Sequence, residues 1–89
     1  MNVSYIARIS GRVQGVYFRA SSQQQAIEYK LSGYAKNLEG GEVEVLLCGE
    51  ENNIKKMLHW LAIGPEMAEV KTIKHKEIPW QDHRFFSIN

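Results

Sequence analysis

The segment "LEGGEVEVLLCG", residues 38–49, decides the fold that this sequence predicts. Its glycines at 40–41 suit a two-residue hairpin turn, because the backbone of such a turn needs the positive φ that glycine adopts without strain. After the turn, Val43, Val45 and Leu47 alternate with other residues, and this period of two is typical of a strand with one buried face. The segment therefore predicts two neighbouring antiparallel strands joined by a tight turn.

The residues before this hairpin predict a strand, a helix and a second, short strand. Residues 3–10 alternate an apolar set with a more polar one, which indicates a strand. Residues 18–32 contain neither Gly nor Pro and predict a helix that ends in a left-handed cap at Gly33, with residues 34–38 as the short strand after it. Two sets of side chains fit the buried face of this helix: Ser22, Ala26 and Tyr29, or Ala20, Ile27 and Leu31.

The residues after the hairpin predict a second helix, which we expect to end at the Gly-Pro pair of residues 64–65. The helix is indicated by apolar residues at the spacing i, i+3, i+4, i+7, namely Ile54, Met57, Leu58 and Leu61.

Two more strands complete the predicted order of elements. Ala68 and Val70 begin a fourth strand, whose apolar alternation slips before Ile73 and so predicts a β-bulge. Phe86 and Ile88 indicate a possible short C-terminal strand. The resulting βαββαβ order predicts an α+β, ferredoxin-like sandwich, in which two helices cover one face of an antiparallel sheet.

The composition limits the class of protein. The 89 residues match one domain over 1–89, which would bury roughly 60–65 per cent of its unfolded surface. Lys and Arg number 11 against 10 Asp and Glu, so the net charge of +1 gives no general attraction for nucleic acid or for an acidic membrane. The single cysteine, Cys48, favours a reducing cytoplasm, and no apolar run resembles a signal peptide or a membrane span. We expect a soluble, cytoplasmic monomer.

The segment "GRVQGVYFRA", residues 11–20, joins the first predicted strand to the first predicted helix. A turn that opens a helix presents unpaired N–H groups and the positive end of the helix dipole. Gly15 lets the backbone curl, and the guanidinium of Arg19 adds a planar, permanently charged fork that matches two oxygens of a tetrahedral anion. The segment therefore predicts a phosphate-binding nest built from Gln14, Gly15, Val16, Tyr17, Phe18 and Arg19.

A purely structural interpretation also fits this segment. Gly11 and Gly15 then only shape a turn, while Val16 and Phe18 pack in the core and Arg19 is solvated. Against this, the helix dipole disfavours a cation at a helix start unless an anion is bound there. The pattern alone leaves both interpretations open.

The segment at 11–19, "GRVQGVYFR", resembles the phosphate-binding signature of the acylphosphatase family, Gly-x-Val-Gln-Gly-Val-x-Phe-Arg, and matches it at every fixed position. Residues 31–45, "LSGYAKNLEGGEVEV", are similar to the family's second motif, in which a Gly, an aromatic residue, two further residues and Asn-Leu precede a glycine hairpin. Residues 64–70, "GPEMAEV", resemble a third family feature. The resemblance covers nearly the whole chain and implies a small stand-alone acylphosphate phosphohydrolase.

The resemblance implies hydrolysis of an acyl phosphate to a carboxylate and inorganic phosphate, with two catalytic residues. Arg19 binds the phosphoryl group together with the amides of residues 15–19, and Asn37 orients the attacking water. The leaving carboxylic acid has a pKa of about 4, so it departs without a general acid. Because Arg19 and the amides stabilise the charge on the phosphoryl oxygens, we expect no metal and no cofactor.

Two other functions share the predicted fold. The first is a module that binds phosphate without turnover. The presence of Asn37 is the only sequence feature that favours the enzyme over this module, so an activity assay has to decide. An RNA-binding module has the same order of elements, but it needs exposed aromatic residues on the central strands. The sequence instead places on that face Ile6, Arg8, Ser10, Glu42, Glu44 and Leu46.

Overall fold

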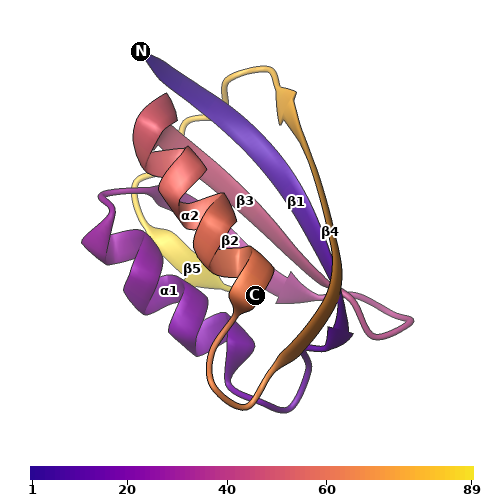
Figure 1. The fold of residues 1–89 in the computed structure, drawn as a ribbon. Helices are drawn as coiled ribbons and strands as arrows, with labels where there is room; N and C mark the ends of the chain where they lie inside the picture. The colour runs from indigo at the N-terminus through magenta and orange to yellow at the C-terminus, as the bar shows by residue number, and fades with distance from the viewer.

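A computed structural model of the protein describes residues 1–89, and its elements follow the predicted order (Figure 1). The elements are β1 (Asn2–Arg12), α1 (Phe18–Glu28), β2 (Ser32–Asn37), β3 (Val43–Glu50), α2 (Glu51–Ile63), β4 (Glu69–Ile78) and β5 (Phe86–Ile88). The predicted α+β, ferredoxin-like fold with a short C-terminal strand is confirmed.

The five strands form one sheet in the order β4-β1-β3-β2-β5. β1 pairs antiparallel with both β3 and β4, and β2 pairs antiparallel with β3, as predicted. β5 lies parallel to β2, so the sheet is mixed and the prediction of a wholly antiparallel sheet is wrong in this one strand. The reason is topological: the chain passes from β4 at one edge to β5 at the other and reverses direction, and β2 also runs opposite to β4, so β5 and β2 are parallel.

Both helices cover the same face of the sheet (Figure 1). On α2, the predicted stripe is buried in full: Ile54, Met57, Leu58 and Leu61. On α1, the first of the two proposed sets faces the core, since Ser22 and Ala26 are buried and Tyr29 is half-buried, while Ile27 is 63% exposed. Leu31 of the second set is also buried, but it lies beyond the end of the helix. Neither helix combines the length and the apolar character needed to cross a membrane.

The end of α1 differs from the prediction. The helix ends at Glu28, and the left-handed residue after it is Lys30, with φ 58°, instead of Gly33. Gly33 lies within β2 at φ 133°, where an added Cβ would stand 1.9 Å from the carbonyl oxygen of Leu46. The glycine is therefore required by the close approach of β2 to β3. The residues that precede and follow a helix give no sign of such a contact.

The hairpin between β2 and β3 has a three-residue turn, and the predicted two-residue turn is wrong. The Leu38 N–H donates to the Glu42 carbonyl (2.8 Å), so Glu39 lies in the turn together with the two glycines. Gly40 and Gly41 have φ of 94° and 99°, which confirms the expected need for glycine. With this register Asn37 is the last residue of β2, opposite Val43, and only Leu38 separates it from the turn.

The predicted bulge in β4 is confirmed. Ser10 pairs with Thr72 while Gly11 pairs with Val70, so Lys71 is the extra residue. Beyond the bulge the pairing continues to Arg12, so β1 is longer than the predicted strand at 3–10. The extended β1 carries the chain to the end of the sheet where α1 begins.

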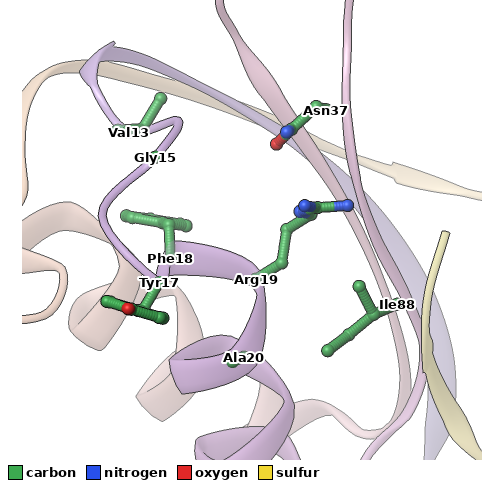
Figure 2. Close-up of a pocket in the computed structure, with 8 residues that line it drawn as sticks. All are labelled: Val13, Gly15, Tyr17, Phe18, Arg19, Ala20, Asn37 and Ile88. Atoms are coloured by element: carbon green, nitrogen blue, oxygen red, sulfur yellow. The ribbon is translucent and has the colours of Figure 1, made fainter.

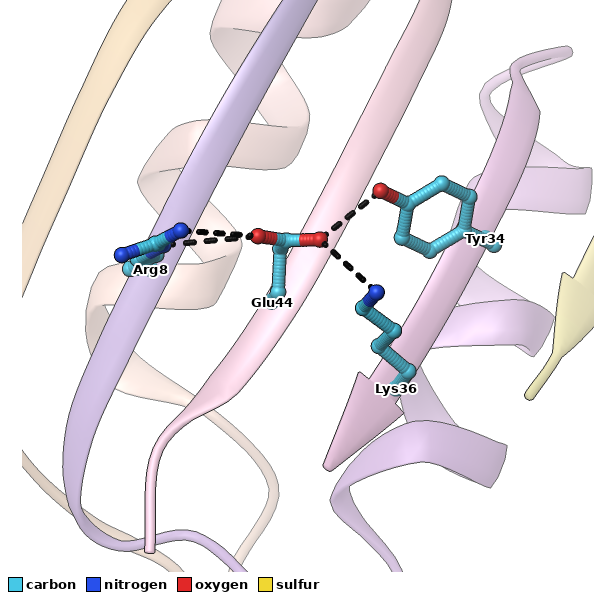
Figure 3. A network of polar contacts seen from close by, with 4 residues as sticks. All are labelled: Arg8, Tyr34, Lys36 and Glu44. Atoms are coloured by element: carbon cyan, nitrogen blue, oxygen red, sulfur yellow. Dashed lines mark hydrogen bonds and ion pairs between the residues drawn. The ribbon is translucent and has the colours of Figure 1, made fainter. Parts of the chain in front are cut away.

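The face of the sheet away from the helices carries a polar network across three strands (Figure 3). Glu44 of β3, only 7% exposed, pairs with Arg8 of β1 (3.3 Å) and Lys36 of β2 (3.6 Å), and accepts a hydrogen bond from the Tyr34 hydroxyl (2.8 Å). Burial, helped by the hydrogen bond to Glu44, raises the pKa of Tyr34 to about 12. The ring of Tyr34 also lies 6.2 Å from that of His83, so it is not a free aromatic surface.

Candidate active site

A cavity of about 400 Å³ lies where the turn after β1, the start of α1 and the ends of β2 and β5 meet (Figure 2). It is lined by Val13, Gly15, Tyr17, Phe18, Arg19, Ala20, Asn37 and Ile88. The structure thus brings Arg19 and Asn37, which are distant in the sequence, to one cavity.

The turn at residues 13–17 has an alternating backbone. Gly15 and Tyr17 have positive φ, 75° and 61°, whereas the residues on either side of each do not. Alternation of left-handed and ordinary residues turns successive N–H groups toward one side, which is the geometry of an anion-binding nest. The turn therefore has the backbone shape that a bound tetrahedral anion requires.

Buried side chains hold this turn in place. Val13, Val16 and Phe18 are each at most 3% exposed, while Gly15 and Tyr17 between them are exposed. The ring of Phe18 lies 6.2 Å from that of Trp60 on α2, which fixes the start of α1 against the core. Packing within the protein therefore holds the turn in this shape, as a preorganised site requires.

Gln14 and Val16 were predicted to contribute to the phosphate nest, and neither lines the cavity. The Gln14 carboxamide donates instead to the carbonyls of Leu38 and Glu42, both at 2.9 Å. These bonds tie the turn to the hairpin that follows Asn37, so Gln14 fixes the spacing between the two halves of the site.

The first turn of α1 is open to a ligand. Its N-cap is Tyr17, whose side chain makes no capping hydrogen bond, and no acidic residue lies in the first turn. Helix N–H groups without such partners carry partial positive charge and bind anions.

Arg19 directs its guanidinium into the cavity, between Asn37 and Ile88 (Figure 2). One nitrogen, Nη1, donates to the main-chain oxygen of Asn89 (3.0 Å), and neither of the two salt bridges in the structure involves Arg19. No acidic side chain lines the cavity, so no Asp or Glu neutralises the charge of Arg19 there.

Asn37 is the last residue of β2 and is exposed. Its carboxamide points toward the Arg19 guanidinium (Figure 2). An uncharged group with both donor and acceptor atoms therefore stands beside a cation and an open helix end.

Comparison with known proteins identifies the family of this site. The family model described as acylphosphatase matches residues 5–88. The chain belongs to the acylphosphatase family. It is 76% identical over 88 residues to an acylphosphatase of Colwellia psychrerythraea, with 99% of each chain covered. The predicted family and the predicted enzyme class, a hydrolase of acyl phosphates, are confirmed.

Solved acylphosphatase structures share the whole fold. An acylphosphatase from Coxiella burnetii superposes with a TM-score of 0.96 at 38% identity, covering 99% of this chain and 93% of that one. The acylphosphatase from Bacillus subtilis gives a TM-score of 0.94 at 36% identity, with 100% and 99% covered.

Three residues of this acylphosphatase cavity escaped the sequence analysis: Val13, Ala20 and Ile88. Val13 lies within the recognised signature, and Ala20 follows it directly, so their proximity to Arg19 was a usable signal. Ile88 had no such signal, because its place depends on the parallel pairing of β5 with β2.

Proposed function

We propose that the chain hydrolyses acyl phosphates by in-line attack of a water that Asn37 orients on a phosphoryl group held by Arg19 and the amides of residues 15–19. The observation that carries the proposal is one cavity that joins the Arg19 guanidinium, an uncapped helix start and the Asn37 carboxamide, with no acidic side chain in its lining.

Binding of the phosphoryl group rests on three sources of positive potential. These are the nest at Gly15 and Tyr17, the free N–H groups of α1 and the guanidinium of Arg19. In phosphoryl transfer the transition state spreads negative charge over the equatorial oxygens, and donors fixed in advance stabilise that charge without reorganisation. The buried anchors Val16 and Phe18 keep these donors fixed.

Asn37 has the chemistry to position the water. Its carboxamide oxygen can accept a hydrogen bond from the water while its NH₂ group donates to a phosphoryl oxygen. Neither interaction depends on pH, because the group does not titrate. Holding the water in line gives a rate gain by orientation alone.

Release of phosphate from benzoyl phosphate, with a chelator present, tests the proposal. We expect Arg19→Ala to lose both turnover and binding of inorganic phosphate, and Asn37→Ala to lose turnover while phosphate still binds. Loss of one preorganised donor typically lowers kcat by about 10²–10³-fold. Phosphate binding is measured by calorimetry on the same samples.

Matched controls are Arg84→Ala and Asn52→Ala, which remove the same side chains at exposed positions outside the cavity. Both should retain wild-type turnover, and phenyl phosphate should not be cleaved. Full activity of Arg19→Ala or Asn37→Ala, or a requirement for added metal, would refute the assigned roles. Phosphate binding without turnover by the wild type would identify a binding module instead.

A further inference from the structure

Tyr17 stands in a conformation that its side chain does not favour. Its φ of 61° and ψ of 26° are left-handed, a region in which a residue with a bulky side chain is strained and a glycine is not. The ring is 76% exposed, so packing within the protein does not explain why a tyrosine occupies this position. An exposed ring held at a strained position beside Arg19 indicates a contact with a ligand.

The cavity has a polar side and an apolar side. In Figure 2, Asn37 lies on one side of the Arg19 guanidinium, while Tyr17, Ala20 and Ile88 lie on the other. Ala20 is exposed, and Ile88 is 41% exposed despite being apolar. These three residues, which we call the apolar rim, therefore present hydrocarbon surface at the mouth of the cavity.

In-line attack relates the two sides. The water and the leaving oxygen stand on opposite faces of the phosphoryl group. If Asn37 holds the water, the leaving acyl group extends away from Asn37 and therefore toward the apolar rim.

We propose that the apolar rim seats the acyl group, with the Tyr17 ring as its main contact, and that the enzyme consequently prefers aromatic and other bulky apolar acyl phosphates to small ones. This inference rests on the proposed function. The rim offers flat ring surface and methyl groups, and no charged residue other than Arg19 lines the cavity. A second anionic group on the acyl chain would find no partner there.

The test is the ratio of kcat/KM for benzoyl phosphate to kcat/KM for acetyl phosphate. We expect Tyr17→Gly to lower this ratio about five- to tenfold, because only the aromatic acyl group stacks on the ring. Glycine adopts the φ of residue 17 without strain, so the nest keeps its shape in this variant. Tyr17→Phe keeps the ring and should keep the ratio.

Ile27→Ala is the matched control, because it removes another exposed apolar side chain of α1 outside the cavity. It should leave the ratio at the wild-type value. A general loss of structure would lower both kcat/KM values together and would not move the ratio.

The outcomes separate the two proposals. An active wild type whose ratio is unchanged by Tyr17→Gly overturns the acyl seat and leaves the proposed function standing. A ratio that falls equally in Tyr17→Phe, or in Ile27→Ala, also overturns the seat, because the ring at position 17 is then not the contact. A wild type that cleaves neither anhydride overturns both proposals.

Discussion

The hydroxyl of Tyr34 is hydrogen-bonded to one buried carboxylate, that of Glu44. Glu44 also pairs with Arg8 and Lys36 and so links three strands at one point. The pKa of Tyr34 is raised from its ordinary value of 10 to about 12, chiefly by burial. A raised pKa means that the folded state holds the hydroxyl proton more tightly than the unfolded chain does.

The stability of the protein at alkaline pH should depend on Tyr34. The protonated hydroxyl contributes fully below about pH 10, and its contribution is lost as the pH rises through about 12. We expect Tyr34→Phe to lower the free energy of unfolding by about 1 kcal/mol at pH 8, as for a typical hydrogen bond, and the gap to wild type to shrink toward pH 12. Urea unfolding at several pH values measures the gap.

The wild type and Tyr34→Phe can also be compared at lower pH, as a control. Between pH 7 and pH 9 the gap should stay constant, since the hydroxyl remains protonated in both states. A gap that is as large at pH 12 as at pH 8 would contradict the prediction.

At the scale of elements, β2 is held between two strands at a distance that only glycine permits. Gly33 pairs with Leu47 of β3 and with Phe86 of β5, and an added Cβ would overlap the Leu46 carbonyl. Gly40, in the hairpin turn, has a similar positive φ but open space around it. The two positions therefore share backbone strain and differ in sterics.

Substitution by alanine separates these effects. Gly40→Ala should cost about 1 kcal/mol of unfolding free energy, the price of a left-handed alanine. Gly33→Ala adds the clash with β3, so we expect a loss of at least about 3 kcal/mol, within the range of severe single substitutions. Urea unfolding of both variants provides the comparison, and equal losses would show that β2 and β3 can separate at no cost.

At the scale of the whole molecule, the site joins segments from both ends of the chain. The turn at residues 13–17 and the start of α1 come from the first part, while Ile88 and Asn89 come from the last. The Asn89 N–H donates to the carbonyl of Ala35, and the Asn89 oxygen accepts from Arg19. A ligand held by Arg19 is therefore bound only by the folded protein.

Phosphate should consequently stabilise the native state. At a phosphate concentration of about 100 Kd, linkage predicts a gain of about 2.7 kcal/mol, visible as a rise in Tm of several degrees. Arg19→Ala should show no rise beyond that in sodium chloride of equal ionic strength, while Asn37→Ala should behave like the wild type. An equal rise in Arg19→Ala would mean that phosphate acts elsewhere or through the solvent.

The elements that the sequence predicts well are those determined by residues close together in the sequence. The stripe of α2, the strand after Gly41 and the bulge at Lys71 each leave a periodic signal within a few turns or residues, and the structure has all three. The predicted end of α1 at Gly33 is wrong, because a glycine after a helical pattern has the same local signal whether it caps the helix or lies in a strand. The conformation of Gly33 is in fact imposed by β3, which is remote from the helix in the chain.

The sequence by itself determined the order of the elements, the glycine hairpin at residues 40–41 and the presence of Arg19 beside a glycine turn at a helix start, because these depend on backbone preferences over a few adjacent residues. Only the tertiary structure decided that β5 pairs parallel with β2, that Gln14 faces the hairpin, and that Ile88 completes the cavity opposite Asn37. Such arrangements depend on which surfaces pack together after the chain has crossed the sheet, and that choice is made by burial and hydrogen bonding between residues far apart in the sequence.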